Sequence, residues 1–389
     1  MRLLRASAVM TTLLLLLAAC SDSGSGGEML SELGEPEGEL NLVIWAGYAE
    51  DGSAYPEFDW VTPFEDETGC QVNATVQADS ATGVQMLQSG EYDGGSFSGN
   101  ATDRLMAGGD VAPVNVDLLE NYDAVFDGLK NQPHNSLDGV PYGVPHGRGP
   151  NLLAWNTDEV EAQTSQVGLW EDAANYEGQL SLFDSPDFIA DASLHLMATQ
   201  PDLGITNPYQ LNQEQFDAAI ALLEEQFTHN PQFWDGNTFA DQITQFAAGD
   251  ITIGTTWQYQ VNSLVAEAAP IEAVKPEEGA TGWSDTWMIS SQAAHPNCMY
   301  LWMDHMMSAE ANGQATVYFG EAPTSQAACD YAESIAPGHC EQTHATDEAY
   351  WDDIWYWSTA REDCADDDDA TTCVDYDAWV EAWTTLRGS

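Results

Sequence analysis

Between residues 41 and 98 short apolar runs alternate with segments of helical pattern, and this alternation constrains the fold more than any other feature of the chain. Asn41–Trp45 (NLVIW) predicts a strand, and Gln71–Gln77 alternates apolar and polar residues as a second strand does. A helix lies between them, another contains Met86, and a third strand follows at 92–98. This β-α-β-α-β order is typical of a parallel sheet that binds ligands where its strands end. The predicted fold class is therefore α/β.

A Pro- and Gly-rich segment, Gly139–Asn156, interrupts this pattern in mid-chain and predicts a crossing to a second domain. Further strand and helix patterns over 180–256 indicate a second α/β unit. The Gly-rich stretch Glu278–Trp287 cannot be a regular helix, so we expect a loop or strand edge there and the return crossing. Two such lobes enclose a cleft. The expected boundaries are 39–147 and 284–389 for lobe 1, and 148–283 for lobe 2.

The N-terminus has the order of an export signal, with Arg2 and Arg5 before a short apolar run. The run ends in Leu-Ala-Ala-Cys at Cys20, which resembles the lipobox of bacterial lipoproteins, where the cysteine carries lipid after cleavage. We expect residues 1–20 to be this signal and 21–38, rich in Ser, Gly and Glu, to be a flexible tether. The protein would then be exported and lipid-anchored to the outer face of the cytoplasmic membrane. The alternative is an ordinary cleaved signal with an unrelated cysteine.

The chain has 7 cysteines, so six, an even number, remain beyond Cys20. Disulfides persist in exported proteins. Closeness in sequence suggests two pairs and leaves a third, although six cysteines allow 15 connectivities. The competing interpretation is zinc, but there is no C-x-x-C and the histidines show no ligand spacing, so we expect no metal and no cofactor. The expected pairs are Cys70–Cys298, Cys329–Cys340 and Cys364–Cys373.

The charge balance is strongly acidic, with 64 Asp and Glu against 8 Lys and Arg, a formal net charge of -56. Such a field excludes nucleic acids and anionic lipid surfaces as partners. It suits a surface that must stay hydrated in concentrated salt, where self-repulsion is screened. We therefore predict a halophilic protein whose surface attracts cationic ligands.

Aromatic residues recur where the predicted strands end, and they do so on both lobes. An aromatic face beside a carboxylate suits an organic cation, because the ring supplies a negative quadrupole face and the carboxylate supplies the opposite charge. Each tryptophan alone fits a core position as well as a ligand wall. Their recurrence at strand ends favours a cation-binding cleft. The candidates are Trp45, Tyr48, Ser98, Trp257, Trp283 and Asp285.

From about residue 40 to 328 the chain resembles the periplasmic spermidine/putrescine-binding proteins of ABC importers. The matching motifs are the W-x-x-Y after the first strand, the Tyr-Asp strand leading to Ser98, the segment ending at Trp257, and P-x-E-G-x-x-x-W-x-D over Pro276–Asp285. The resemblance implies a two-lobe periplasmic-binding-protein fold (type II-like) and a monomer that serves an ABC permease and ATPase. It implies that the four aromatic candidates surround a polyamine, that Asp285 holds an amine, and that Ser98 contributes a hydrogen bond.

The chain departs from that family at the far end of the ligand. Where the family carries an Asp and a Glu, this sequence has Ser185 and Phe188, with Asp184 or Asp187 as substitutes. The segment at 320–328 resembles a loop of the family in which Glu321 replaces a tyrosine. We therefore expect a site that includes Glu321 and lacks one distal carboxylate. Putrescine, spermidine, a guanidino compound and a quaternary amine all remain candidates.

Two other functions compete with ligand capture for import. The run Gly94–Gly99 (GGSFSG) lacks the G-x-S-x-G spacing of a nucleophile elbow, and the sequence has no HExxH, P-loop or dinucleotide fingerprint, so we do not expect an enzyme. A sensory or adhesive lipoprotein on the same fold is the alternative, because a fold does not fix a function. The Trp-rich region after Cys329 is expected to form helices that pack across the lobes.

Overall fold

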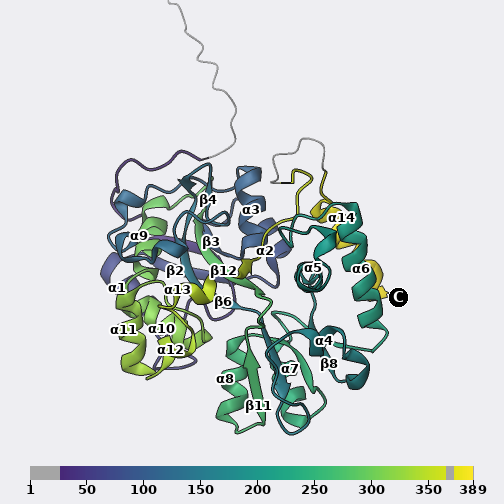
Figure 1. The fold of residues 1–389 in the computed structure, drawn as a ribbon. Helices are drawn as coiled ribbons and strands as arrows, with labels where there is room; N and C mark the ends of the chain where they lie inside the picture. The colour runs from purple at the N-terminus through teal and green to yellow at the C-terminus, as the bar shows by residue number, and fades with distance from the viewer. Residues whose placement is uncertain (1–26, 365–371, 389) are drawn as a thin grey trace, which may run out of the picture.

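The computed structural model describes residues 27–364 and 372–388, which form two α/β lobes joined by extended segments (Figure 1). The predicted two-lobe α/β class is confirmed. The expected signal segment 1–20 and its Cys20 lie outside the described residues. Over the part of the chain that is described, no helix has the length and apolar character needed to cross a membrane.

Lobe 1 is built on a six-stranded sheet in the order β13-β12-β3-β1-β2, with β6 paired to β12. The strands β1 and β2 are parallel, as are β1 and β3, whereas β12 runs antiparallel to β3 and β6. Alternate residues of β1 pack against opposite faces, since Leu42 contacts the α1 and α9 layer and Val43 the α2 and α3 layer. The buried end of β1, covered on both faces, is accordingly an uninterrupted apolar run from Leu42 to Ile44. The strands are β1 (Glu39–Ile44), β2 (Gln71–Val76), β3 (Gly94–Phe97), β6 (Gly143–Pro150), β12 (Ala280–Ile289) and β13 (Ile354–Tyr356). The helices are α1 (Val61–Thr68), α2 (Ser80–Gln88), α3 (Gly99–Gly108), α9 (Pro296–Met306), α10 (Ala309–Phe319), α11 (Gln326–Ile335), α12 (His339–Gln342) and α13 (Glu348–Trp351).

Lobe 2 has a five-stranded sheet in the order β11-β7-β10-β8-β9. Its longest helix, α6, begins with a capping box in which the side chains of Asn212 and Gln215 each bond the other's backbone N–H, as the spacing of these residues predicts. The strands are β7 (Leu152–Asn156), β8 (Leu180–Phe183), β9 (Gln232–Trp234), β10 (Ile253–Thr256) and β11 (Ile271–Val274). The helices are α4 (Val167–Trp170), α5 (Phe188–Thr199), α6 (Gln213–Phe227), α7 (Phe239–Ala248) and α8 (Gln258–Ala266).

The two crossings between the lobes are the paired strands β6 and β12. They run antiparallel from Gly143 opposite Met288 to Pro150 opposite Gly282, and the register shifts between Asp285 and Thr286. The expected boundaries at 147/148 and 283/284 therefore fall inside this strand pair. The stretch that was expected to be a loop or a strand edge is instead part of a ten-residue strand.

The C-terminal segment belongs to lobe 2, so its assignment to lobe 1 was wrong from about Trp357 onward. Helix α14 (Tyr376–Gly388) packs on the lobe 2 helix α6 (Figure 1). Trp379, Trp383 and Leu386 recur at helical spacing and enter the lobe 2 core. The chain thus crosses between the lobes a third time after β13.

Residues 27–38 lie against lobe 1 and are not the free tether that was expected there. The backbone N–H of Gly34 donates to Oδ1 of Asn297 at 2.6 Å, and the N–H of Cys298 donates to Oε2 of Glu37 at 2.9 Å. Leu30 packs against the lobe 1 core. Only the part of the expected tether before residue 27 stays a prediction, since it is outside the described range.

All three expected disulfides are present: Cys70–Cys298, Cys329–Cys340 and Cys364–Cys373. The first joins the start of β2 to α9 across 228 residues of sequence. The second joins α11 to α12, and the third lies in the crossing segment before α14.

Candidate functional site

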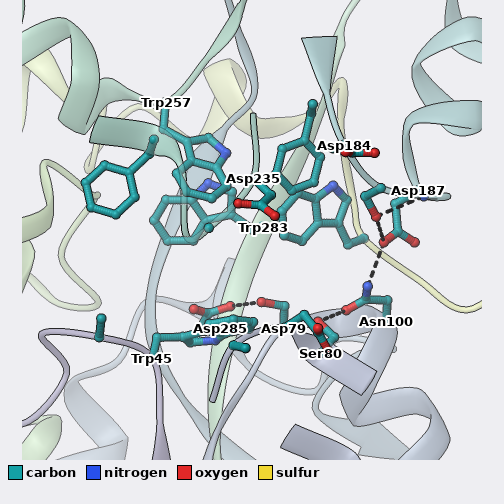
Figure 2. A pocket seen from close by; sticks show the side chains of 18 of the residues that line it. Trp45, Asp79, Ser80, Asn100, Asp184, Asp187, Asp235, Trp257, Trp283 and Asp285 are labelled. Carbon is teal, nitrogen blue, oxygen red and sulfur yellow. Dashed lines mark hydrogen bonds between the residues drawn. The ribbon is translucent and has the colours of Figure 1, made fainter. Parts of the chain in front are cut away.

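A cavity of about 500 Å³ lies between the lobes, and both lobes contribute its walls (Figure 2). From lobe 1 come residues that follow β1, β2 and β3, together with residues of β12 and the end of α10. From lobe 2 come residues that follow β8, β9 and β10, and part of α14. Hydrogen bonds join the lobes beside the cavity, from Nδ2 of Asn100 to Asp187 at 2.7 Å and from Nδ2 of Asn237 to the Ala78 carbonyl at 3.1 Å. The lobes are therefore in contact beside the cavity.

Asp285 is a buried carboxylate, 4% exposed, in the lobe 1 wall. The Tyr48 hydroxyl donates to its Oδ2 and the Ser98 hydroxyl donates to its Oδ1, both at 2.6 Å. Ser98 follows β3, Tyr48 follows β1, and Asp285 lies at the register shift of β12, where a bulge re-aims a side chain. Burial raises the pKa of Asp285, and the two hydrogen bonds oppose that rise. The carboxylate is thus positioned and desolvated, without a cationic partner among the described side chains that hydrogen-bond to it.

Glu321 lies behind this wall and does not line the cavity, so its placement in the site was wrong. It is 1% exposed, and its Oε1 lies 3.1 Å from Nε2 of His146, whose ring stacks on Tyr48. The Trp287 indole N–H donates to Nδ1 of His146, so the imidazole proton is on Nε2 and faces Glu321. Burial raises the pKa of Glu321. Bulky Tyr48 and His146 separate this second carboxyl group from the cavity.

Aromatic side chains form most of the remaining wall. Trp45, Trp257 and Trp283 all line the cavity as predicted, and the rings of Trp257 and Trp283 meet edge to face with centroids 6.3 Å apart. Phe183 and Trp357 add a stacked pair, 5.3 Å apart and 12° from parallel. Trp45 comes from lobe 1 and Trp257 from lobe 2, on opposite sides of the space (Figure 2).

Asp187 is the buried carboxylate at the other end of the cavity, 2% exposed. Its Oδ2 accepts hydrogen bonds from Nδ2 of Asn100 and, at 2.8 Å, from Oγ of Ser185, while its Oδ1 has no hydrogen-bond partner among the residues that the structure describes. Burial raises its pKa to about 6. One turn further along α5, burial raises the pKa of Asp191 to about 7, and Thr281 donates to that carboxylate. This end of the site therefore holds an unpaired acceptor.

Of the residues expected at this far end, the structure brings Asp184 and Ser185 to the cavity but not Phe188. Phe188 is 1% exposed and packs in the lobe 2 core, with its ring 5.6 Å from that of Trp170. It begins α5, and the first helical turn carries it inward while Asp187 stays at the surface of the cavity.

Sequence reasoning missed several wall residues. Asp79 caps α2, accepting from the Thr82 N–H at 2.7 Å, and Asp235 follows β9, accepting from the Thr238 N–H at 2.9 Å. Both follow predicted or observed strands, so the strand-end rule that found Trp45 could have found them. Together with Asp184, Asp187 and Asp285 they make five aspartates in the wall. Among the described residues that line the cavity, none is Lys, Arg or His. The other missed wall residues include Ser80, Asn100, Phe239, Tyr259, Tyr318, Phe319 and Tyr376.

Comparisons with known proteins find similarity to solute-binding proteins both in sequence and in structure. Residues 59–340 match the family model described as bacterial extracellular solute-binding protein. Spermidine/putrescine-binding periplasmic protein 1 of Haemophilus influenzae is 22% identical over 315 residues, 79% of this chain and 81% of that protein. A spermidine/putrescine ABC transporter substrate-binding protein from Streptococcus pneumoniae superposes with a TM-score of 0.67 at 16% identity, over 90% of this chain and 97% of that one.

The same fold also holds other ligands. The binding protein MotA of A. tumefaciens B6, solved in complex with glucopine, superposes with a TM-score of 0.65 at 18% identity, over 90% of this chain and 99% of that one. The ligand class of the present cavity must therefore be argued from its own residues. Those residues offer carboxylates and aromatic faces, which suit a cation with an apolar body.

Proposed function

This chain belongs to the family of bacterial extracellular solute-binding proteins, and we propose that it captures a small organic cation of the putrescine and spermidine class and delivers it to the permease of an ABC importer. One observation carries the proposal: five aspartates and many aromatic rings line the cavity, and no described lining residue is cationic. An anionic ligand would meet uncompensated repulsion there. The polyamines in the names of the relatives agree with this choice.

In this proposal Asp285 holds one ammonium group. Hydrogen bonds from Tyr48 and Ser98 fix the carboxylate and leave acceptor capacity facing the cavity. A charge-assisted hydrogen bond to the ligand replaces the water that the ammonium loses. The indoles of Trp45 and Trp283 cover the methylene groups, and each cation-π contact contributes about 0.5 to 2 kcal/mol. An ammonium beside Asp285 also opposes the rise in its pKa that burial causes.

In this proposal Asp187 binds the other end of the ligand. It comes from lobe 2 and Asp285 from lobe 1, so a ligand with a cation at each end bridges the lobes. Only such a ligand gains contacts on closure, and it therefore favours the closed state from which a permease accepts it. The unpartnered Oδ1 of Asp187 supports this role.

The location and partners of the protein follow the same proposal. After export, lipid on Cys20 would hold the protein at the outer face of the cytoplasmic membrane, with the residues before 27 as a short tether. The protein would act as a monomer with an ABC permease and ATPase, and it would bind its ligand without chemical conversion. The order of basic residues, apolar run and Leu-Ala-Ala-Cys supports the anchor.

Calorimetric titration with putrescine, spermidine, agmatine and glycine betaine, in a fixed high-salt buffer, tests the proposal. We expect at least one of the di- or polyamines to bind and Asp285→Asn to weaken that binding at least tenfold. Asp66→Asn, which makes the same change of charge at an exposed position on α1, should leave binding unchanged. Binding of no amine, or equal binding by Asp285→Asn and the wild type, would contradict the proposal.

A further inference from the structure

One aspartate of the cavity wall already has a cationic partner within the protein. Arg387, in the last turn of α14, donates from Nε to Oδ1 of Asp184 and from Nη2 to Oδ2, both at 3.0 Å. The indole N–H of Trp383 donates to the same Oδ1 at 2.9 Å. The guanidinium also lies 3.6 Å from the centre of the Phe233 ring, which fixes its orientation. Both oxygens of Asp184 therefore accept hydrogen bonds from α14, and Arg387 compensates the charge of the carboxylate.

This pairing stands out against the composition of the chain. Only 8 residues are Lys or Arg, against 64 Asp and Glu, so nearly every carboxylate must remain without a cation. Arg387 pairs with a carboxylate that lines the ligand cavity. None of the other four wall aspartates has an ion pair among the described side chains, although the charge of Arg104 acts to lower the pKa of Asp187.

Asp184 and Asp187 lie at the same end of the cavity, at the end of β8 (Figure 2). Helix α14 closes this end, since Tyr376 and Val380 also line the cavity. The end thus presents one carboxylate with a free oxygen, Asp187, and one whose charge a bidentate guanidinium compensates. A ligand amine that approaches Asp184 meets a carboxylate whose charge is already compensated, and it meets the positive charge of Arg387.

We propose that Arg387 is a specificity-determining residue, a resident cation that compensates the charge of Asp184 and so disfavours longer amines with a third charge. The inference rests on the proposed function, because it concerns the choice among amines. It predicts that loss of the guanidinium leaves a second uncompensated carboxylate beside Asp187. Longer trications would then gain affinity relative to short dications.

The test compares the dissociation constants of putrescine and spermidine in four variants at one salt concentration. Arg387→Met keeps the aliphatic stem over Phe233 and should improve the spermidine-to-putrescine affinity ratio at least tenfold. Asp184→Asn should leave that ratio within threefold of the wild type, and the double variant should behave as Asp184→Asn does. Arg387→Lys retains the charge and should keep the wild-type ratio.

A ratio that stays within twofold of the wild type in Arg387→Met, in a wild-type protein that binds both amines, would overturn this inference alone. A wild-type protein that binds neither amine would instead refute the proposed function. Circular dichroism checks folding, and Arg387→Gln serves as a second neutral variant if Arg387→Met does not fold. An equal gain for both amines would also count against the inference, because it would reflect general charge and not the length of the ligand.

Discussion

Replacing Asp187 with asparagine separates the cost of a buried charge from the benefit of a bound cation. Asn100 and Ser185 both donate to Oδ2 of Asp187, and Oδ1 has no partner. An asparagine carbonyl in the position of Oδ2 keeps both hydrogen bonds, and its amide nitrogen takes the position of Oδ1. The substitution therefore removes the charge with little change in local geometry, and it turns an acceptor for the ligand into a donor.

The size of the effect follows from the pKa. Burial raises the pKa of Asp187 from 3.8 to about 6 in the folded protein. When the pKa of an acid is higher in the folded than in the unfolded protein, the protein loses stability as the pH rises from the unfolded-state pKa to the folded-state pKa. The loss is complete above the folded-state pKa. This rise corresponds to about 3 kcal/mol. We expect Asp187→Asn to be more stable than the wild type by up to about 3 kcal/mol at pH 7.5, with the difference vanishing below pH 4.

Urea unfolding of the ligand-free proteins at pH 4 and pH 7.5, at constant high salt, measures this difference. Asp66→Asn is the control for the change in net charge, and titration with putrescine at pH 7.5 supplies the second readout. We expect Asp187→Asn to gain stability and to bind the amine at least tenfold more weakly. A stability difference that does not change with pH would refute the argument from burial. Undiminished affinity would remove Asp187 from the ligand site.

Three further predictions use the same protein. Because burial raises the pKa of Glu321, Glu321→Gln should raise the free energy of unfolding, and the gain should grow as the pH rises above 4.5. Its amine affinity should change less than threefold. A tenfold loss of affinity in a titration would show that Glu321 does bind the ligand. Replacing Cys70 and Cys298 with alanine should lower the unfolding free energy by about 5 kcal/mol, against about 3 for Cys329 and Cys340, since the loops span 228 and 11 residues; equal urea midpoints would contradict the loop argument. The melting temperature should rise with NaCl concentration, because salt screens repulsion in a chain of net charge -56, and a constant value would count against halophily.

The sequence was sufficient to predict most of the fold because its signals are local. The order of strands and helices from β1 to β3 and the capping box of α6 follow from nearby residues. Nearby residues do not predict which of the two lobes α14 packs on. An apolar face at helical spacing shows that the helix is buried on one side, and the same face would suit a groove of either lobe. Only tertiary packing of Trp379 and Trp383 decides the question.

In the candidate site, too, some residues could be predicted from the sequence and others could not. Trp45, Ser98 and Trp257 were found because strand ends converge on one edge, which is a property of topology. Phe188 and Glu321 were misplaced because position there depends on the phase of a helix and the depth of a loop. A shift of one residue exchanges Phe188 for Asp187, and no periodicity in that short segment reveals which one faces the cavity.

The buried carboxylates suggest why closure should depend on the ligand. Asp187 of lobe 2 and Asp285 of lobe 1 are both buried in the cavity wall, and burial raises the pKa of each. Without a ligand cation the lobes must either hold protons on these groups or separate and return them to water. A ligand that carries a cation at each end removes that cost in both lobes at once, whereas a monocation relieves one lobe only. In the proposed function, closure of the lobes thus depends on the charge of the ligand for two reasons. The ligand cations make direct contacts, and they offset the cost of desolvating the aspartates of the protein.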